Sequence, residues 1–170
     1  MSSTPFPLSA IAPGVLAELR ERDDAGAVPA LWTDGTDGAP LRCCLRRAGG
    51  GERVALVSYA PLRRWAARTG ATPGAYDEVG PVFVHLDGCA GPDPAAGYPF
   101  AETGASRVVR RYTARGAISG GEFVALPPDP AEAQAVVRGA LERAFADPDV
   151  ALVHVRAVEY GCFLYEVGRP

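Results

Sequence analysis

Two histidines stand at the centre of the chemistry that this sequence could perform. His85 ends the apolar run 80–85 (GPVFVH), and His154 lies inside the run 150–156 (VALVHVR). Imidazole is the side chain whose unperturbed pKa lies close to neutral pH, so it can both accept and release a proton there. We therefore take His85 and His154 as the first candidates for acid/base catalysis.

Strand parity predicts which polar side chains accompany the two histidines. Side chains alternate between the two faces of a strand, so His154 shares a face with Arg156. We expect both histidines on the same face of one sheet, on adjacent or next-adjacent strands. If residues 41–46 form a neighbouring strand, its polar face adds three further side chains, those of Arg42, Cys44 and Arg46.

Such a set of residues suits an anionic organic molecule. Arginine binds carboxylates and phosphates through a bidentate fork, and histidine supplies the acid or base. Cys44 could act as a nucleophile because nearby cations lower a thiol pKa. Glu78, just before the Gly-Pro step, could orient a histidine. The ligand-binding residues that we predict are Arg42, Arg46, Arg156 and Tyr160, with Arg156 as the main anchor.

Each of these residues also has a plainer interpretation. Either histidine could be a hydrogen-bonded structural residue, Cys44 a packing residue, and Glu78 a solvated loop acid. Arg156 lies in a run too apolar for a surface strand, and a buried guanidinium must find an acceptor. That acceptor is either a ligand or a protein carboxylate such as Glu78 or Glu159.

A metal site is the alternative use of the same histidines. A zinc ion could be held by the loosely spaced set His85, Cys89, His154 and Cys162. The four cysteines form no C-x-x-C pair, and the sequence has no Walker, G-x-G-x-x-G, H-E-x-x-H or G-x-S-x-G motif. We therefore expect neither a bound metal nor an organic cofactor.

Composition excludes several classes of protein. The 170 residues are 48% hydrophobic and 22% charged, with a net charge of −3, which argues against a nucleic-acid partner. All 17 basic residues are arginine, as in a GC-rich bacterial genome, so Schiff-base lysine chemistry is excluded. We find no pattern of a signal peptide or a membrane span and expect a cytoplasmic protein with no membrane partner.

Hydrophobic periodicity predicts the elements that must position these residues. Helices are expected at 13–23, 61–69 and 130–146, the last with Asp129 as its N-cap. Strands are expected at 41–45, 53–60, 81–86 and 106–115, and a hairpin at 151–158 and 162–167. These elements predict one α+β domain over residues 1–170, with a mostly antiparallel mixed sheet and two to three packed helices. Residues 1–39 form its N-terminal helix and loop, and 40–167 its core.

Several segments resemble one family. The segments are PLRCCLR (40–46), GERVALVSY (51–59), EVGPVFVH (78–85) and LVHVRAVEYGCFLYEV (152–167). In this order they resemble domain-of-unknown-function family 1203, over about residues 40–167. The resemblance implies a boundary for the fold and points to the same residues, but it implies no reaction.

Three hypotheses about function follow. The first is a small enzyme that acts on an anionic organic metabolite by histidine acid/base chemistry; a biosynthetic pathway is one setting for it. The second is a non-catalytic module that binds a similar molecule in the same pocket. The third is an interaction protein whose arginine-rich faces, such as that of Arg63, Arg64 and Arg68, meet an acidic partner. A homodimer stays open.

Overall fold

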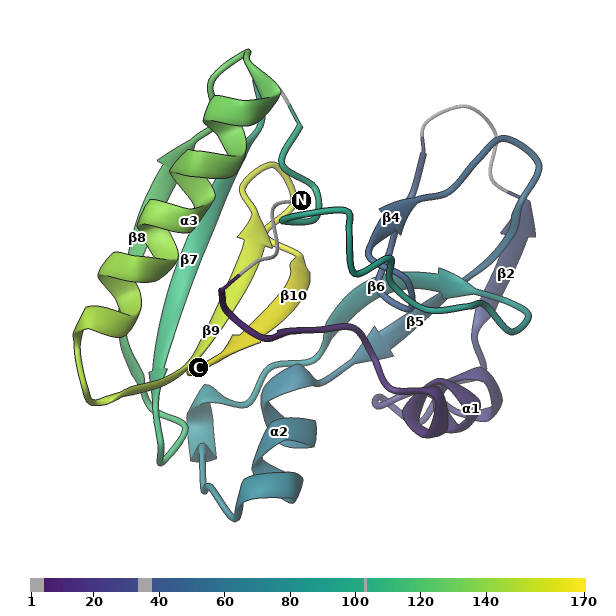
Figure 1. The fold of residues 1–170 in the computed structure, drawn as a ribbon. Helices are drawn as coiled ribbons and strands as arrows, with labels where there is room; N and C mark the ends of the chain where they lie inside the picture. Colours follow the sequence, from purple (N-terminus) through teal and green to yellow (C-terminus); the bar gives the residue numbers. More distant parts are fainter. Residues whose placement is uncertain (1–4, 34–37, 103) are drawn as a thin grey trace.

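The strands form two five-stranded sheets, seen side by side in the computed structural model (Figure 1). The structure describes residues 5–33, 38–102 and 104–170. Residues 1–4, part of the N-terminal stretch in which the sequence predicts no signal peptide, lie outside the described residues. Across sheet A the order is β1 (Leu8–Ser9), β10 (Phe163–Gly168), β9 (Val150–Ala157), β7 (Ser106–Thr113) and β8 (Ile118–Ala125). Across sheet B the order is β2 (Ala30–Thr33), β5 (Arg53–Tyr59), β6 (Gly80–His85), β3 (Pro40–Leu41) and β4 (Arg46–Arg47).

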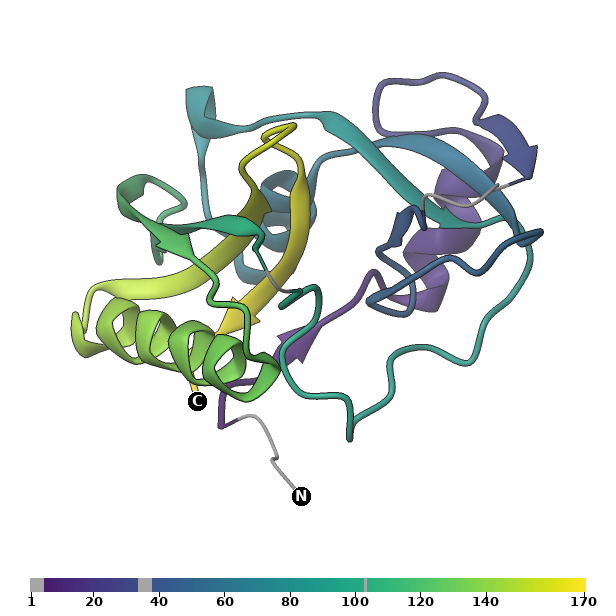
Figure 2. The ribbon, with the colours of Figure 1, turned by 90° about the horizontal axis from the view of Figure 1, so that it is seen from above.

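Helix α3 (Pro130–Ala146) covers one face of sheet A (Figures 1 and 2). Its N-terminus is capped by Asp129, whose carboxylate accepts a hydrogen bond from the backbone N–H of Glu132. One helix stripe, including Leu141, packs against the residues of β9 that point towards it, Val153 and Val155. This stripe and this strand face are the ones that the sequence pattern predicts.

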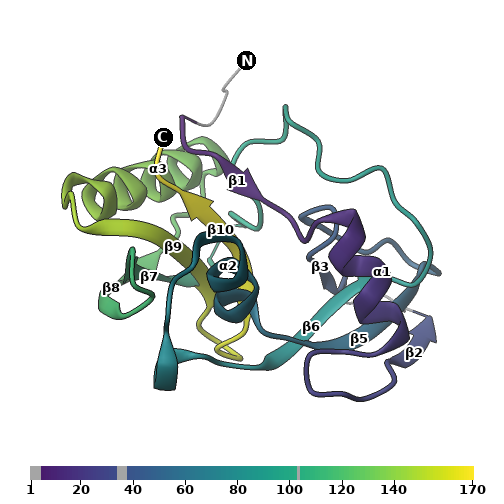
Figure 3. The same ribbon diagram turned by 90° about the horizontal axis from the view of Figure 1, so that it is seen from below.

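Helix α2 (Pro61–Thr69) packs against the face of sheet A opposite to α3 (Figure 3). Pro61 starts it, and Gly70 ends it with φ of 78°, a conformation that glycine adopts without strain. Leu62 and Trp65 pack against Tyr112 of β7 and Leu152 of β9. The predicted alternation of β9 is therefore confirmed, with Leu152 opposite in direction to Val153.

Sheet B is covered by α1 (Pro13–Glu21), whose Leu16 and Leu19 pack into the cluster that includes residues of β5. Its paired strands are antiparallel except for β3 and β6, which run parallel with Leu41 opposite Phe83. A short 3₁₀ turn, η1 (Gly74–Tyr76), lies between α2 and β6. Figure 3 shows β1 at the edge of sheet A, from which the chain crosses to α1.

The two sheets meet where β10 approaches sheet B. The rings of Tyr59 in β5 and Phe163 in β10 lie 5.6 Å apart. Nearby, the Arg42 guanidinium donates from Nε to the carbonyl oxygen of Phe163 over 2.8 Å. The side chain of Arg42, just after β3, is thus held against β10 of sheet A.

The α+β fold with three packed helices is confirmed, but two expectations about its strands are wrong. Residues 41–45 do not form a strand: β3 ends at Leu41, and residues 42–45 form a turn in which Leu45 has a φ of 57°. The single expected sheet is in fact two sheets. They separate His85, at the end of β6, from His154, in β9.

Candidate functional site

The turn between β3 and β4 brings two cysteines to His85. Because β3 runs parallel to β6, the backbone N–H of Arg42 donates to the carbonyl oxygen of Phe83 over 2.9 Å. The backbone N–H of His85 then points at the Cys43 sulfur, at 3.2 Å. A fourth residue, Cys89, reaches the same place from the loop after β6. These positions create a thiol–imidazole cluster from elements that are adjacent in sheet B.

The sulfur and nitrogen atoms of this cluster lie close together. The His85 Nδ1 atom is 3.4 Å from the Cys43 sulfur and 3.8 Å from the Cys44 sulfur. The two vicinal sulfurs are 4.0 Å apart. With the Cys89 sulfur included, all four ligand atoms lie within 4.8 Å of one another, so the cluster could hold one metal ion.

Glu52 fixes the orientation of the imidazole. Its Oε1 atom lies 2.9 Å from His85 Nε2, and its two oxygens accept hydrogen bonds from Arg46 over 2.6 and 3.0 Å. Hydrogen bonds from Arg46 and then His85 hold the Glu52 pKa well below its usual range. An ionised carboxylate only accepts hydrogen bonds, so Nε2 donates its N–H to Glu52, and the other ring nitrogen, Nδ1, faces the sulfurs.

The two vicinal thiols differ in acidity. The hydrogen bond from the Cys43 thiol, the backbone N–H of Arg46 and the charges of His85 and Arg46 lower the pKa of Cys44 to about 6, against an opposing effect of burial. The same hydrogen bond, together with burial, raises the pKa of Cys43. Cys44 is therefore the more acidic thiol of the pair.

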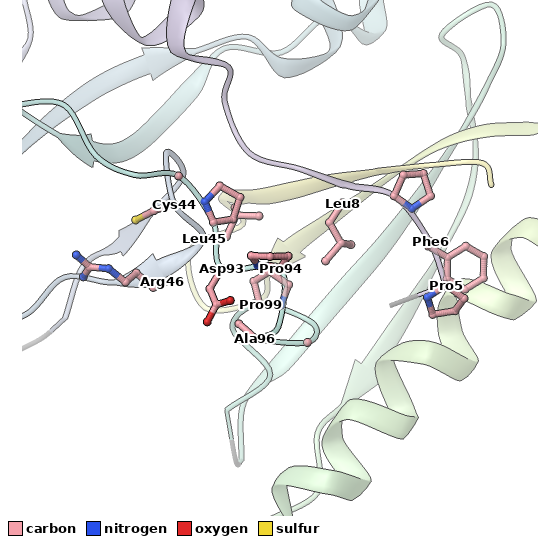
Figure 4. Close-up of a pocket in the computed structure, with 14 residues that line it drawn as sticks. Pro5, Phe6, Leu8, Cys44, Leu45, Arg46, Asp93, Pro94, Ala96 and Pro99 are labelled. Atoms are coloured by element: carbon pink, nitrogen blue, oxygen red, sulfur yellow. The ribbon is translucent and has the colours of Figure 1, made fainter. Parts of the chain in front are cut away.

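A cavity of about 660 Å³ adjoins this cluster (Figure 4). Cys44 and Arg46 lie towards one end, and Phe6 of the N-terminal segment lies at the other. The loop that contains Asp93 forms another wall. Cys44 lines this cavity, but because Arg46 is already paired with Glu52, the described lining residues offer no unpaired cation.

A second cavity, of about 520 Å³, lies between the two sheets. Most of its wall is apolar and comes from both sheets, including Leu56 and Phe83 of sheet B and Leu164 of sheet A. Three arginines, Arg42, Arg47 and Arg107, and one acid, Glu159, also line it. The cavity therefore combines an apolar chamber with buried positive charge.

Arg42 is a buried cation without a protein carboxylate. Its residue is 2% exposed, and its Nε and Nη1 atoms donate to the backbone carbonyls of Phe163 and Pro40. No carboxylate lies within 4.0 Å of it in the part of the chain that the structure describes. Burial lowers its pKa to about 10, so it stays charged at neutral pH. By contrast, Arg107 pairs with Glu102 at 3.0 Å.

His154 does not join this site. Its ring is fully buried between those of Tyr112 and Phe163, whose centroids lie at 4.7 and 5.0 Å. Neither ring nitrogen has a hydrogen-bond partner among the described residues, and burial lowers the pKa to about 3. The expected pairing of His85 with His154 is wrong because the strands belong to different sheets.

The four residues of the alternative zinc set, His85, Cys89, His154 and Cys162, do not come together, for the same reason. His85 and Cys89 do lie together, but His154 is enclosed in sheet A. Cys162 lies at the C-terminal hairpin, beside the inter-sheet cavity. The cysteines that join His85 and Cys89 are instead the vicinal pair in the turn.

Glu78 orients no histidine. Its carboxylate pairs with Arg110 at 3.0 Å and with Arg156 at 3.3 Å. Arg156 also donates to the carbonyl oxygen of Gly161, so the predicted main anchor already has protein acceptors. Both residues and the largely exposed Tyr160 line a small cavity of about 230 Å³, and Tyr160 also lines the inter-sheet cavity.

Sequence reasoning missed Glu52 and the role of Cys43. Glu52 had a signal, because it is the one acid in a segment, 42–68, that holds seven arginines. Cys43 had none, because strand parity places it away from Cys44. The exposed arginines proposed for an acidic partner are paired within the chain: Arg63, Arg64 and Arg68 each contact a carboxylate.

Comparison with known proteins gives a family but no activity. Among the described helices, none is long and apolar enough to cross a lipid bilayer. No curated protein and no solved structure matches the chain. The family described as Protein of unknown function (DUF1203) matches residues 38–169, a range that contains the thiol–imidazole cluster and the inter-sheet cavity. The chain therefore belongs to the DUF1203 family of proteins of unknown function.

Proposed function

We propose that the protein binds an anionic organic molecule, a carboxylic acid with an apolar body, in the cavity between the two sheets. The observation that carries the proposal is Arg42, a buried guanidinium on the cavity wall with no carboxylate within 4.0 Å among the described residues. A buried charge is costly unless it is paired and hydrogen-bonded. A ligand carboxylate in the cavity would supply the missing countercharge.

The hydrogen bonds of Arg42 leave room for such a ligand. Two of its nitrogens donate to backbone carbonyls, which orient the guanidinium plane. Its Nη2 atom makes no hydrogen bond to a described residue. Arginine binds carboxylates with two parallel N–H donors, and such charge-assisted bonds are stronger than neutral ones. The backbone contacts thus preorganise Arg42 to accept an anion from the cavity.

The rest of the wall suits the apolar body of the ligand. Leu56, Phe83 and Leu164 offer apolar surface, and Tyr160 stands beside the cavity with 85% of its surface exposed. Small-molecule sites are commonly apolar cavities of several hundred Å³ with a few polar groups that fix orientation. The cavity volume of about 520 Å³ falls in that range.

Calorimetry with matched acids and amides tests this proposal. We expect octanoate and phenylacetate to bind, and the corresponding amides, which lack the charge, to bind much more weakly. Arg42→Met should weaken binding of the acids by on the order of 2 to 5 kcal/mol, whereas Arg53→Met, at an exposed arginine of β5, should leave it unchanged. The acid–amide comparison needs no variant, so it remains decisive if Arg42→Met does not fold. Equal binding of acids and amides would refute the role of Arg42.

A second candidate function is an enzyme that acts on an anionic organic metabolite by histidine acid/base chemistry. The chain of contacts from Cys44 through His85 to Glu52, beside the cavity of about 660 Å³, favours it. In this hypothesis Nδ1 of His85 takes the proton of the Cys44 thiol and the sulfur attacks an electrophilic carbon. The bond from that carbon to the leaving group breaks, and the leaving group takes the electron pair and the proton from Nδ1.

Alkylation with iodoacetamide, followed by peptide mass spectrometry, tests the second candidate. Cys44 should react faster than Cys162, and His85→Asn should slow its reaction while leaving that of Cys162 unchanged. A Cys44 that reacts no faster than Cys162 would contradict the enzyme hypothesis.

A further inference from the structure

We propose that Cys43, Cys44, His85 and Cys89 form a zinc site, bound through their three sulfurs and Nδ1 of the imidazole. This inference goes beyond the proposed ligand site and does not depend on it. It concerns the turn at residues 42–45 and the loop after β6, and it uses atoms that the carboxylate ligand would not contact.

The distances among the sulfurs of Cys43 and Cys44 and the His85 Nδ1 atom match those of tetrahedral coordination, and the Cys89 sulfur lies within 4.8 Å of all three. With zinc–sulfur and zinc–nitrogen bonds of about 2.3 and 2.0 Å, two sulfurs lie about 3.8 Å apart, and a sulfur and a nitrogen about 3.5 Å apart. The measured separations are 4.0 Å between the sulfurs of Cys43 and Cys44, and 3.4 and 3.8 Å from these sulfurs to Nδ1. Small side-chain rotations would therefore suffice to seat the ion.

The chemistry of the ligands favours zinc among common divalent ions. Three cysteine sulfurs and one imidazole form the Cys₃His set typical of closed structural zinc sites. Hard ions such as Mg²⁺ and Ca²⁺ require oxygen ligands, and none of these four atoms is an oxygen. Three thiolates bring excess negative charge, which the backbone N–H that His85 directs at the Cys43 sulfur and the charge of Arg46 partly offset.

Glu52 completes the arrangement behind the imidazole. A histidine that binds a metal through one nitrogen commonly donates its other N–H to a carboxylate, which fixes the tautomer and the ring orientation. The contact of 2.9 Å between His85 Nε2 and Glu52 places the carboxylate there and leaves Nδ1 free to coordinate. Arg46 holds Glu52 in turn. The imidazole of His85 therefore faces the three sulfurs with Nδ1 and the Glu52 carboxylate with Nε2, as a zinc ligand would.

The position of the site in the fold gives the ion a role. Cys89 lies at the start of the loop that follows β6 and includes the Gly- and Pro-rich stretch 88–99, in which no helix or strand forms. An ion would tie this loop to the turn at residues 42–45 and to the end of β6. Structural zinc contributes directly to folding free energy, so the ion would replace packing that this loop lacks.

Elemental analysis of the full chain tests the zinc site. Protein expressed in zinc-supplemented medium and freed of loosely bound metal should retain about one zinc ion per chain. Cys89→Ser should reduce the zinc content, because it removes one of the four ligand atoms. Cys89 lies in a loop, so we expect the variant to keep its fold. Cys162→Ser is the matched control and should keep the full content. Glu52→Gln should weaken zinc affinity by roughly 10–100-fold.

Cobalt substitution provides a readout of the ligand set itself. Co²⁺ in place of zinc should give the thiolate-to-metal charge-transfer absorption and the intense visible bands of tetrahedral coordination, and Cys89→Ser should diminish the charge-transfer absorption. Two results would overturn the inference: no zinc bound after reconstitution of the reduced chain, or a native disulfide between Cys89 and one of the vicinal cysteines. Bound zinc would in addition occupy Nδ1 and so rule out the acid/base use of His85, while leaving the carboxylate site untouched.

Discussion

Acidification should destabilise the protein through His154, and His154→Leu should remove this effect. The imidazole is enclosed between Tyr112 and Phe163, and burial lowers its pKa to about 3, from 6.5 for the free side chain. The folded state therefore holds a neutral imidazole at pH values where the unfolded chain binds a proton. The contribution of the neutral His154 ring to the free energy of unfolding is fully present above pH 6.5. It is lost progressively as the pH falls from about 6.5 towards 3.

The size of this effect follows from the difference between the two pKa values. A pH of 5 is about 1.5 units below the pKa of the imidazole in the unfolded chain, so the imidazole is mostly protonated there. In the folded protein it is still neutral at this pH. Each unit corresponds to about 1.4 kcal/mol, so between pH 7 and pH 5 the His154 contribution to the free energy of unfolding falls by about 2 kcal/mol. For a chain of this length that corresponds to a shift in Tm of roughly 4–8 °C.

Urea denaturation of the wild type and of His154→Leu, followed by tryptophan fluorescence at pH 7, 6 and 5, measures this effect. Other titrating groups affect both proteins alike, and any packing cost of leucine is independent of pH. We expect the variant to gain about 2 kcal/mol relative to the wild type between pH 7 and pH 5. Neither ring nitrogen of His154 has a hydrogen-bond partner among described residues, so the substitution leaves no new polar group unsatisfied.

A difference between the two proteins that stays constant from pH 7 to pH 5 would refute this reasoning. It would mean that the folded protein accommodates the imidazolium, through an opening that the buried ring does not show. A difference that grows in favour of the wild type would refute it more strongly, because the sign of the pKa shift would then be wrong.

Three further predictions concern the framework around the site, each measured as a change in the free energy of unfolding. Leu141→Ala should cost about 2–5 kcal/mol, because the leucine is fully buried between α3 and sheet A; a smaller loss would mean that the core closes around the missing atoms. Asp129→Ala should cost about 1 kcal/mol through loss of the N-cap bond to Glu132, and Asp129→Asn should restore most of it. Gly116→Ala should cost about 1–3 kcal/mol, because φ is +88° and a Cβ atom would lie 3.0 Å from Pro73, whereas Gly26→Ala, at a similar φ without close neighbours, should cost less.

The sequence predicts the parts of the fold that repeat a local pattern. The α3 stripe and its Asp129 cap, the alternation of β9, and the C-terminal hairpin all follow from periodicity and turn residues, and the structure confirms them. Strand β8 is not predicted, because Gly120 and Gly121 interrupt it and glycine disfavours strands. There, pairing with β7 over its whole length prevails over local preference.

The site was only partly predictable because its residues meet through long-range pairing. Arg42, Cys44 and His85 were identified by residue type, and their proximity in sheet B depends on the parallel pair β3 and β6, which no local pattern encodes. The assumption of a strand at 41–45 placed Cys43 and Cys44 on opposite faces, whereas the turn directs both sulfurs at one imidazole. His154 was misassigned because a buried and a reactive histidine have the same strand pattern.

The pairing of β1 with β10 has a consequence for the order in which the chain folds during synthesis. In the part of the chain that the structure describes, the strands of sheet B all lie within residues 30–85, so this sheet can assemble while the ribosome is still making the second half. Sheet A instead pairs Leu8 with Val167 and must wait for the last strand. We expect the emerging chain to form sheet B first, with the N-terminal segment unpaired until β10 appears. The pairing of β1 with β10 would then join sheet B to sheet A as the last step of folding.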